Sequence, residues 1–173
     1  MIGLVKPVLF QVAGYQNSGK TTLSLKLIQQ LAAKGLKVAT VKHHGHGGRP
    51  EIVEEKDSDK HVKAGAAVSL VEGGGRMVIH AENDKWSLSE EIDMLSFFKP
   101  DVILIEGYKN EPYPKAVILR DESDLELVGK LHNIKVILCR NSELANVLKD
   151  SSLPVLDINE GVSWIIEYIT GTQ

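Results

Sequence analysis

The chain has 173 residues, the length of one domain with a sizeable buried core. Its 20 basic and 23 acidic residues give a formal net charge of −3, so no bulk positive charge is present to recruit nucleic acid or an anionic membrane. The sequence lacks an apolar run of 18 residues and an N-terminal basic segment followed by an apolar core, and we expect a cytoplasmic protein. The single cysteine, Cys139, lies in an apolar run and is expected to be a buried hydrophobe.

A glycine-rich motif separates the first predicted strand from the first predicted helix. Residues 7–13 form a short apolar run that is typical of a buried strand, and Leu23, Leu27 and Leu31 recur at the spacing of one helix face. Between them, residues 14–21 (GYQNSGKT) fit the pattern G-x-x-x-x-G-K-[ST]. A strand before this loop and a helix after it is the order that the motif requires. The sequence therefore predicts the phosphate-binding loop of nucleoside triphosphatases and kinases, which we call the P-loop.

The residue types of the P-loop suit the binding of a polyphosphate. Gly14 and Gly19 allow a tight turn that brings backbone N–H groups close to a phosphate. The helix that begins near Lys20 presents unpaired N–H groups, Lys20 adds a full charge, and the Thr21 hydroxyl is placed to bind Mg²⁺. The alternative is a glycine-rich turn without a ligand. The residues predicted to bind the nucleotide here are Gly14, Gln16, Asn17, Ser18, Gly19, Lys20, Thr21 and Thr22.

A basic loop follows the second predicted strand, which covers residues 37–41. Residues 42–50 contain no acidic side chain although the chain as a whole is acidic. We expect this loop to contact an anionic group of a nucleotide or of a second substrate. Its three histidines leave two alternatives open, namely a site for metal transfer and a solvated loop. The candidate contacts in this loop are Lys42, His43, His44 and His46.

A short helix and a β-hairpin are predicted next. The helix lies near residues 57–65, and the strands 67–71 and 77–81 flank three glycines at 73–75. Asp57 is a candidate for a second acidic group near Mg²⁺ or for the base that activates the attacking water, and helix capping is its alternative role. Ser87 and Glu90 have the spacing of a capping box at the start of a further helix.

A fully apolar run at residues 102–105 is typical of a central parallel strand that is covered on both faces. Ligands of open α/β sheets bind at the carboxyl ends of the strands, so Glu106 is predicted to hold Mg²⁺, directly or through water. The alternative for Glu106 is a structural role, either capping a helix or pairing with Lys109. We also consider Lys109 a candidate phosphate contact.

Strands and helices continue to alternate in the last third of the chain. Residues 116–119, 135–139 and 154–156 are predicted strands, and helices are predicted at 142–149 and 160–169. This alternation predicts an α/β fold with a mostly parallel sheet flanked by helices, into which the hairpin near 67–81 is inserted. We expect residues 1–173 to form a single P-loop nucleotide-binding domain. Asn141, directly after a predicted strand, is a candidate contact for the nucleotide base.

Several segments together resemble the MobB family, molybdopterin-guanine dinucleotide biosynthesis protein B. They are the P-loop, residues 42–44 (KHH), residues 57–58 (DS) with His61 and residues 64–66 (AGA), and residues 105–109 (IEGYK) and 111–115 (EPYPK), and the similarity covers most of the chain. The resemblance implies a P-loop protein that binds GTP with Mg²⁺, hydrolyses it slowly and forms a homodimer. It also implies an accessory role beside the molybdopterin guanylyltransferase, the enzyme that joins GMP to molybdopterin.

Within this interpretation Lys20, Glu106 and Asp57 are the candidate catalytic residues, and the loop at 42–49 is expected to face a molybdopterin phosphate or a protein partner. The hairpin near 67–81 is expected to supply a dimer edge by adding strands across a symmetry axis. Two other functions remain open at this point. One is a small-molecule kinase that uses the same P-loop, and the other is a metallochaperone GTPase that uses His43, His44 and His46.

Overall fold

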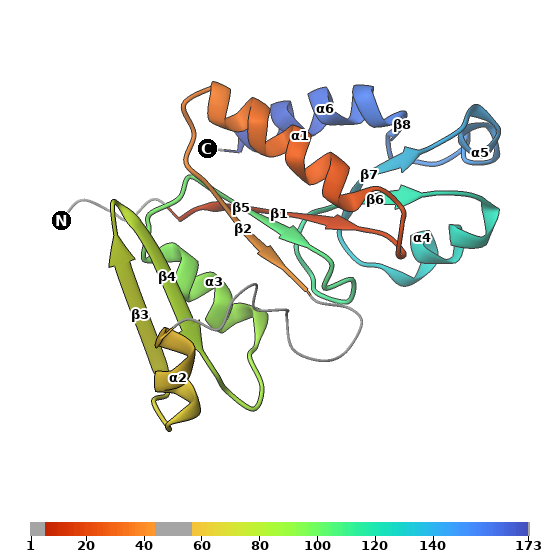
Figure 1. Cartoon of the computed structure of the whole chain (residues 1–173). Coiled ribbons are helices and arrows are strands. Elements are labelled where there is room, and N and C mark those ends of the chain that lie inside the picture. The colour runs from red at the N-terminus through yellow and green to blue at the C-terminus, as the bar shows by residue number, and fades with distance from the viewer. Residues whose placement is uncertain (1–5, 44–56, 173) are drawn as a thin grey trace.

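The computed structural model describes residues 6–43 and 57–172, and within these ranges the chain folds around a six-stranded sheet. The strand order is β2-β5-β1-β6-β7-β8, and every neighbouring pair is parallel (Figure 1). This result confirms the predicted α/β fold with a parallel sheet. The strands are β1 (Val8–Ala13), β2 (Val38–Lys42), β5 (Val102–Glu106), β6 (Lys115–Leu119), β7 (Ile134–Cys139) and β8 (Val155–Leu156).

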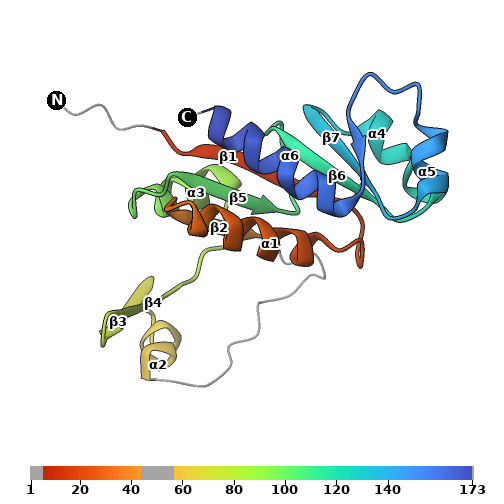
Figure 2. The same ribbon diagram turned by 90° about the horizontal axis from the view of Figure 1, so that it is seen from above.

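Helices cover both faces of the sheet. Helix α1 (Lys20–Ala33) and helix α6 (Ile158–Gly171) lie side by side on one face (Figures 1 and 2). Helix α3 (Leu88–Ser96) and helix α4 (Glu126–Lys130) lie on the opposite face, and Leu144 of helix α5 (Ser142–Val147) packs in one cluster with Leu127 of α4. Because both faces are covered, β5 and β6 are buried along their whole lengths, as the apolar run at 102–105 predicts.

One polar residue in the buried strand β6 is a lysine. Lys115 is fully buried, and its Nζ donates hydrogen bonds of 2.6 Å to the carbonyl oxygens of Glu111 and His132. Burial lowers the pKa of this ammonium group, because a low-dielectric environment disfavours its charged form. The two hydrogen bonds offset part of that cost and attach the loop before β6 to the loop before β7.

Local sequence explains the end of α1 and the start of α3. Gly35 follows α1 with φ of 84°, the left-handed conformation that glycine adopts at low cost. Ser87 and Glu90 form the predicted capping box at the start of α3, in which each side chain binds the backbone N–H of the other residue.

The predicted hairpin is present as a separate two-stranded sheet. Strands β3 (Val68–Gly73) and β4 (Arg76–Ala81) pair antiparallel, and the short helix α2 (Asp57–Lys63) packs against them. Figure 2 shows this unit standing beside the main sheet. Apolar side chains on both strands are about half exposed, and they are Val68, Leu70, Val71, Met77, Val78 and Ile79.

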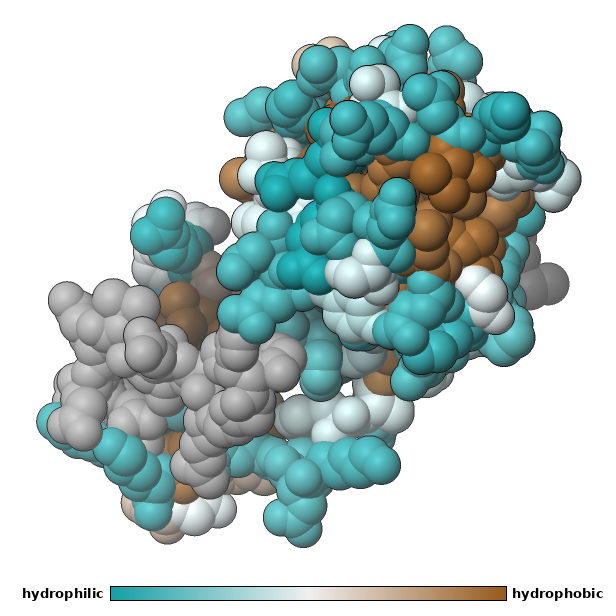
Figure 3. Space-filling model, turned by 90° about the vertical axis from the view of Figure 1, so that its right-hand side faces the viewer, coloured by the Kyte–Doolittle hydropathy of each residue, from teal (hydrophilic) through white to brown (hydrophobic). Residues whose placement is uncertain are grey.

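Two short helical segments were not predicted, namely the 3-10 turn η1 (Glu122–Asp124) and helix α4. Each has at most five residues, too few for a hydrophobic period to be visible in the sequence. The end of the molecule that carries α5 presents an apolar area bordered by polar residues (Figure 3), and Val147 at the end of α5 is 54% exposed. In the part of the chain that the structure describes, no helix is long and apolar enough to span a lipid bilayer.

Candidate functional site

The carboxyl ends of three neighbouring strands, β1, β2 and β5, meet at one edge of the sheet. Register brings Glu106 beside both Val12 of β1 and Lys42 of β2. A cavity of about 860 Å³ opens at this edge. It is lined by Gly14, Tyr15, Gln16, Asn17, Lys20, Thr21, Lys42, His43, Glu106, Gly107, Tyr108, Lys109, Asn110 and Glu111.

The P-loop connects β1 to α1 with the backbone that its glycines predict. Gly14 has φ of 155°, Asn17 has φ of 59° and Gly19 has φ of 100°, so three of its residues lie in conformations that L-amino acids with a side chain rarely adopt. Helix α1 begins at Lys20, directly after the loop. The Lys20 Nζ donates a hydrogen bond of 2.7 Å to the carbonyl oxygen of Tyr15, so the ammonium group lies across the loop.

The electrostatic environment of Lys20 is that of a crowded cationic site. Burial is the main cause that lowers the pKa of Lys20, and the nearby Glu106 carboxylate opposes this shift. Three further cations, Lys109, Lys42 and Arg120, also lower the pKa of Lys20, because like charges disfavour one another. An anion with several charges would relieve this repulsion.

Thr21 and Glu106, the two predicted metal ligands, are brought together by the fold. The Thr21 hydroxyl donates a hydrogen bond of 2.8 Å to Glu106 Oε1, which is largely buried. Oxygen ligands of these two types are those that Mg²⁺ prefers, so the pair fits a magnesium site. Lys42 Nζ lies 3.1 Å from the same carboxylate oxygen and 3.2 Å from the Thr21 hydroxyl. Glu106 therefore pairs with Lys42 rather than with Lys109.

Aromatic side chains form the wall of the cavity beyond the P-loop. The rings of His43 and Tyr108 lie 4.9 Å apart, and the Tyr108 hydroxyl donates a hydrogen bond to Glu91. Burial and this hydrogen bond raise the pKa of Tyr108, which keeps its hydroxyl protonated. Gln11 Nε2 donates hydrogen bonds of 2.6 Å to the carbonyl oxygens of Gly107 and Tyr108 and so holds the loop after β5 against β1.

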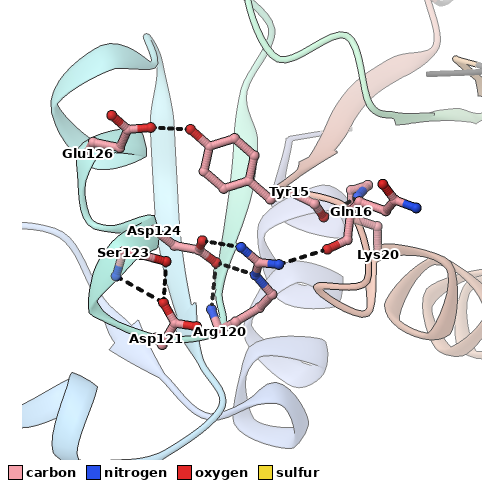
Figure 4. A network of polar contacts seen from close by, with 8 residues as sticks. All are labelled: Tyr15, Gln16, Lys20, Arg120, Asp121, Ser123, Asp124 and Glu126. Atoms are coloured by element: carbon pink, nitrogen blue, oxygen red, sulfur yellow. Dashed lines mark hydrogen bonds and ion pairs between the residues drawn. The ribbon is translucent and has the colours of Figure 1, made fainter. Parts of the chain in front are cut away.

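A polar network lies on the outer side of the P-loop (Figure 4). Arg120 follows β6, and its guanidinium donates to both carboxylate oxygens of Asp124 and to the carbonyl oxygen of Gln16. The Tyr15 hydroxyl donates a hydrogen bond to Glu126 of α4. The contacts of this network were not predicted, because the pairing of β1 with β6 brings its residues together and no local motif does so.

Most of the predicted site residues line the cavity. Ser18, Gly19 and Thr22 belong to the P-loop and the start of α1 but are not part of the lining. Tyr15 and Tyr108 line it although neither was a candidate, because isolated tyrosines carry no sequence signal. The other candidates that line it are Gly14, Gln16, Asn17, Lys20, Thr21, Lys42, His43, Glu106 and Lys109.

Two predicted roles are not supported by position, and a third concerns residues that the structure does not describe. Asp57 was predicted to lie near Mg²⁺, but it begins α2, and this helix lies with the hairpin and away from the P-loop (Figures 1 and 2). Asn141 is outside the lining and caps α5, its Oδ1 accepting a hydrogen bond of 2.8 Å from the Leu144 N–H. His44 and His46 lie outside the described residues, within which no three His, Cys, Asp or Glu side chains gather as a metal site would require.

The fold and the P-loop define an α/β protein of the P-loop nucleoside triphosphatase type. A family profile described as molybdopterin guanine dinucleotide synthesis protein B (MobB) matches residues 9–140, and the chain belongs to this family.

Known relatives agree with this assignment. The chain is 39% identical over 164 residues to a probable molybdopterin-guanine dinucleotide biosynthesis adapter protein of Bacillus subtilis, covering 94% of this chain and 92% of the relative. It is 32% identical to the adapter protein of Escherichia coli, covering 98% and 97% of the two chains. The crystal structure of Bacillus subtilis MobB superposes with a TM-score of 0.79 at 35% identity, covering 93% of this chain and 96% of that one.

Proposed function

We propose that this protein is a GTP-binding adapter in the biosynthesis of molybdopterin guanine dinucleotide and that it hydrolyses GTP slowly with Mg²⁺. Membership of the MobB family supports the biosynthetic role, because relatives that cover nearly the whole chain carry the name of adapter proteins of this pathway. We further propose that it acts in the cytoplasm beside a molybdopterin guanylyltransferase.

The observation that carries nucleotide binding is the concentration of positive charge around the P-loop. Lys20 lies across the loop, and Lys42, Lys109 and Arg120 are close enough to lower its pKa. Two carboxylates, those of Glu106 and Glu111, also line the cavity and offset part of this positive charge. A triphosphate bound by the loop N–H groups and Lys20 would balance this excess of positive charge.

The residues divide the chemistry between them. Loop N–H groups and Lys20 bind the phosphates, and Thr21 and Glu106 hold Mg²⁺, which when bound supplies positive charge to the phosphate oxygens. Helix α2, which begins at Asp57, the predicted base, lies away from the P-loop (Figures 1 and 2). We therefore propose slow hydrolysis, since a group that orients the attacking water or an arginine finger contributes on the order of 10³–10⁵ in rate.

The rest of the cavity suits a second anionic and aromatic ligand. Lys42, His43 and Lys109 line it together with the Tyr108 ring. We propose that molybdopterin or its phosphate faces this wall. The hairpin β3–β4 is proposed as the homodimer edge, because its apolar side chains are about half exposed. Light scattering with size-exclusion chromatography at micromolar concentration tests the dimer, and a monomer would contradict it.

Titration with GTP and Mg²⁺ tests the nucleotide site. Lys20→Ala removes one charge-assisted contact worth about 1.5–3 kcal/mol, so we expect affinity to fall roughly ten- to a hundred-fold. Lys34→Ala, which removes an exposed cation beyond the far end of the same helix, is the matched control. Equal GTP affinity in the Lys20 variant and the wild type would contradict the proposal. Transfer of phosphate to an added small molecule, in place of slow phosphate release, would favour the kinase alternative.

A further inference from the structure

Arg120 makes the most extensive polar contacts on the outer side of the P-loop. Its Nε and one NH2 group donate hydrogen bonds of 2.9 and 2.7 Å to the two carboxylate oxygens of Asp124, and its backbone N–H donates a third at 2.9 Å. Asp124 is fully buried, so its carboxylate is held in one place. The remaining guanidinium nitrogen donates a hydrogen bond of 3.1 Å to the carbonyl oxygen of Gln16.

That last contact acts on the peptide group that joins Gln16 to Asn17. All described peptide bonds are trans, so the carbonyl oxygen of Gln16 and the N–H of Asn17 point in opposite directions from one plane. Arg120 binds the carbonyl from outside the loop (Figure 4). The N–H of Asn17 is thereby directed to the inner side, and both residues line the cavity.

A second contact ties the neighbouring residue of the loop to the same segment. The Tyr15 hydroxyl donates to Glu126 of α4, and the Arg120 guanidinium lies 5.6 Å from the centre of the Tyr15 ring. Two consecutive residues of the P-loop are therefore held by residues 120–126. These contacts use other atoms than the Lys20 contact, in which the Tyr15 carbonyl oxygen accepts from the ammonium group.

We propose that Arg120 is a positioning residue of the nucleotide site. Braced by Asp124, it fixes the plane of the Gln16–Asn17 peptide so that the Asn17 N–H is oriented for a hydrogen bond to a phosphate oxygen before the ligand arrives. A donor that is already oriented binds more tightly than one that must be ordered on binding. This inference rests on the proposed binding of a nucleoside triphosphate.

Arg120 could also favour an anion through its positive charge alone, without positioning the loop. The Asp124→Asn variant distinguishes this charge effect from the proposed positioning. This substitution removes a negative charge close to the site, so charge alone predicts equal or tighter binding of an anion. The positioning role predicts weaker binding, because Arg120 loses its ion pair with Asp124 and no longer holds the Gln16 carbonyl in place. Arg120→Ala removes the contact directly, and Lys149→Ala is a charge-matched control at an exposed position beyond α5.

The experiment measures binding of GTP and of inorganic tripolyphosphate, both with Mg²⁺, to the wild type and to each variant. We expect Arg120→Ala to weaken both ligands by about ten-fold, since one hydrogen bond to a charged group is impaired. Asp124→Asn should weaken both ligands by several-fold, and Lys149→Ala should change neither. Circular dichroism and thermal melting check folding, and Arg120→Lys, which keeps the charge but loses the two-pronged contact with Asp124, replaces any variant that does not fold. It too should bind both ligands more weakly.

Equal or tighter binding by Asp124→Asn or by Arg120→Lys would overturn the inference, because charge would then be the sole effect. A loss in Arg120→Ala for GTP but not for tripolyphosphate would also overturn it, because it would assign Arg120 to the nucleoside. If the wild type itself binds neither ligand, the proposed function fails. If the wild type binds both and loses affinity in Lys20→Ala but not in Arg120→Ala, only the positioning role fails.

Discussion

Replacing Gly14 with alanine tests whether the first residue of the P-loop must be glycine. A Cβ atom at this position would lie 2.6 Å from Ser18 Oγ and 2.9 Å from the carbonyl oxygen of Ile118. Ser18 Oγ has no hydrogen-bond partner among the described residues, so a rotation of this side chain would break no hydrogen bond. The Ile118 carbonyl belongs to the buried strand β6 and cannot move without disturbing the sheet.

Two costs add up in the Gly14→Ala variant. Overpacking of a well-packed interior costs about 1–3 kcal/mol. An alanine held near the φ of 155° that Gly14 adopts is strained by a further 1–3 kcal/mol or so. We therefore expect the free energy of unfolding to fall by roughly 2–6 kcal/mol, which for a chain of this size lowers the melting temperature by about 4–24 °C.

Urea unfolding followed by circular dichroism measures this change. Gly129→Ala is the matched control, because Gly129 lies in α4 with no heavy atom within 4 Å of a built Cβ and no positive φ. The control should be as stable as the wild type or more stable by about 0.5–1 kcal/mol, the helix preference of alanine over glycine. A Gly14 variant within about 0.5 kcal/mol of the wild type would refute the steric reasoning.

Three further predictions concern stability. In Gly161→Ala the new Cβ would lie 2.3 Å from Leu138 Cδ2 in the core, and the overpacking should outweigh the helix gain, so urea unfolding should show a loss of about 1–2 kcal/mol. Lys115→Met leaves two backbone carbonyls without their buried donor, and we expect a loss of roughly 2–4 kcal/mol, whereas an unchanged midpoint would contradict it. Hydrogen bonds from Arg120 lower the pKa of Asp124, so this carboxylate stabilises the fold above about pH 4 and the contribution is lost as pH falls through the lowered pKa. The free energy of unfolding, measured from about pH 5 to pH 2, should therefore fall less for Asp124→Asn than for the wild type. An equal fall in the two proteins would contradict a contribution from the lowered pKa of Asp124.

Features that depend on residues close together in the sequence could be predicted. The P-loop, the Ser87–Glu90 capping box and the hairpin turn each depend on residue types a few positions apart. Glu106 could be predicted as well, because an acidic residue at the end of a fully apolar strand reaches the ligand edge of a parallel sheet. These features obey local rules of backbone conformation and sheet geometry, which leave a visible pattern.

Features that depend on contacts between distant segments could not be predicted. Arg120 meets Gln16 only because β6 pairs with β1, and the sequence carries no mark of that pairing. Asn141 looked like a base contact because it follows a strand, but its side chain caps the next helix. Asp57 was expected near Mg²⁺, yet the inserted hairpin carries its helix away from the P-loop. The order of residues along the chain does not show which distant segments lie side by side in these three cases.

The central place of β1 has a consequence for synthesis on the ribosome. Its partners are β5, where Val8 pairs with Val102, and β6, where Val12 pairs with Ala116. A nascent chain that has emerged only as far as α1 already carries the whole GYQNSGKT motif but has neither flanking strand to fix it. If the chain binds a triphosphate as proposed, that capacity should appear only after β5 and β6 have been synthesised, so ligand capture would report the pairing of these strands with β1.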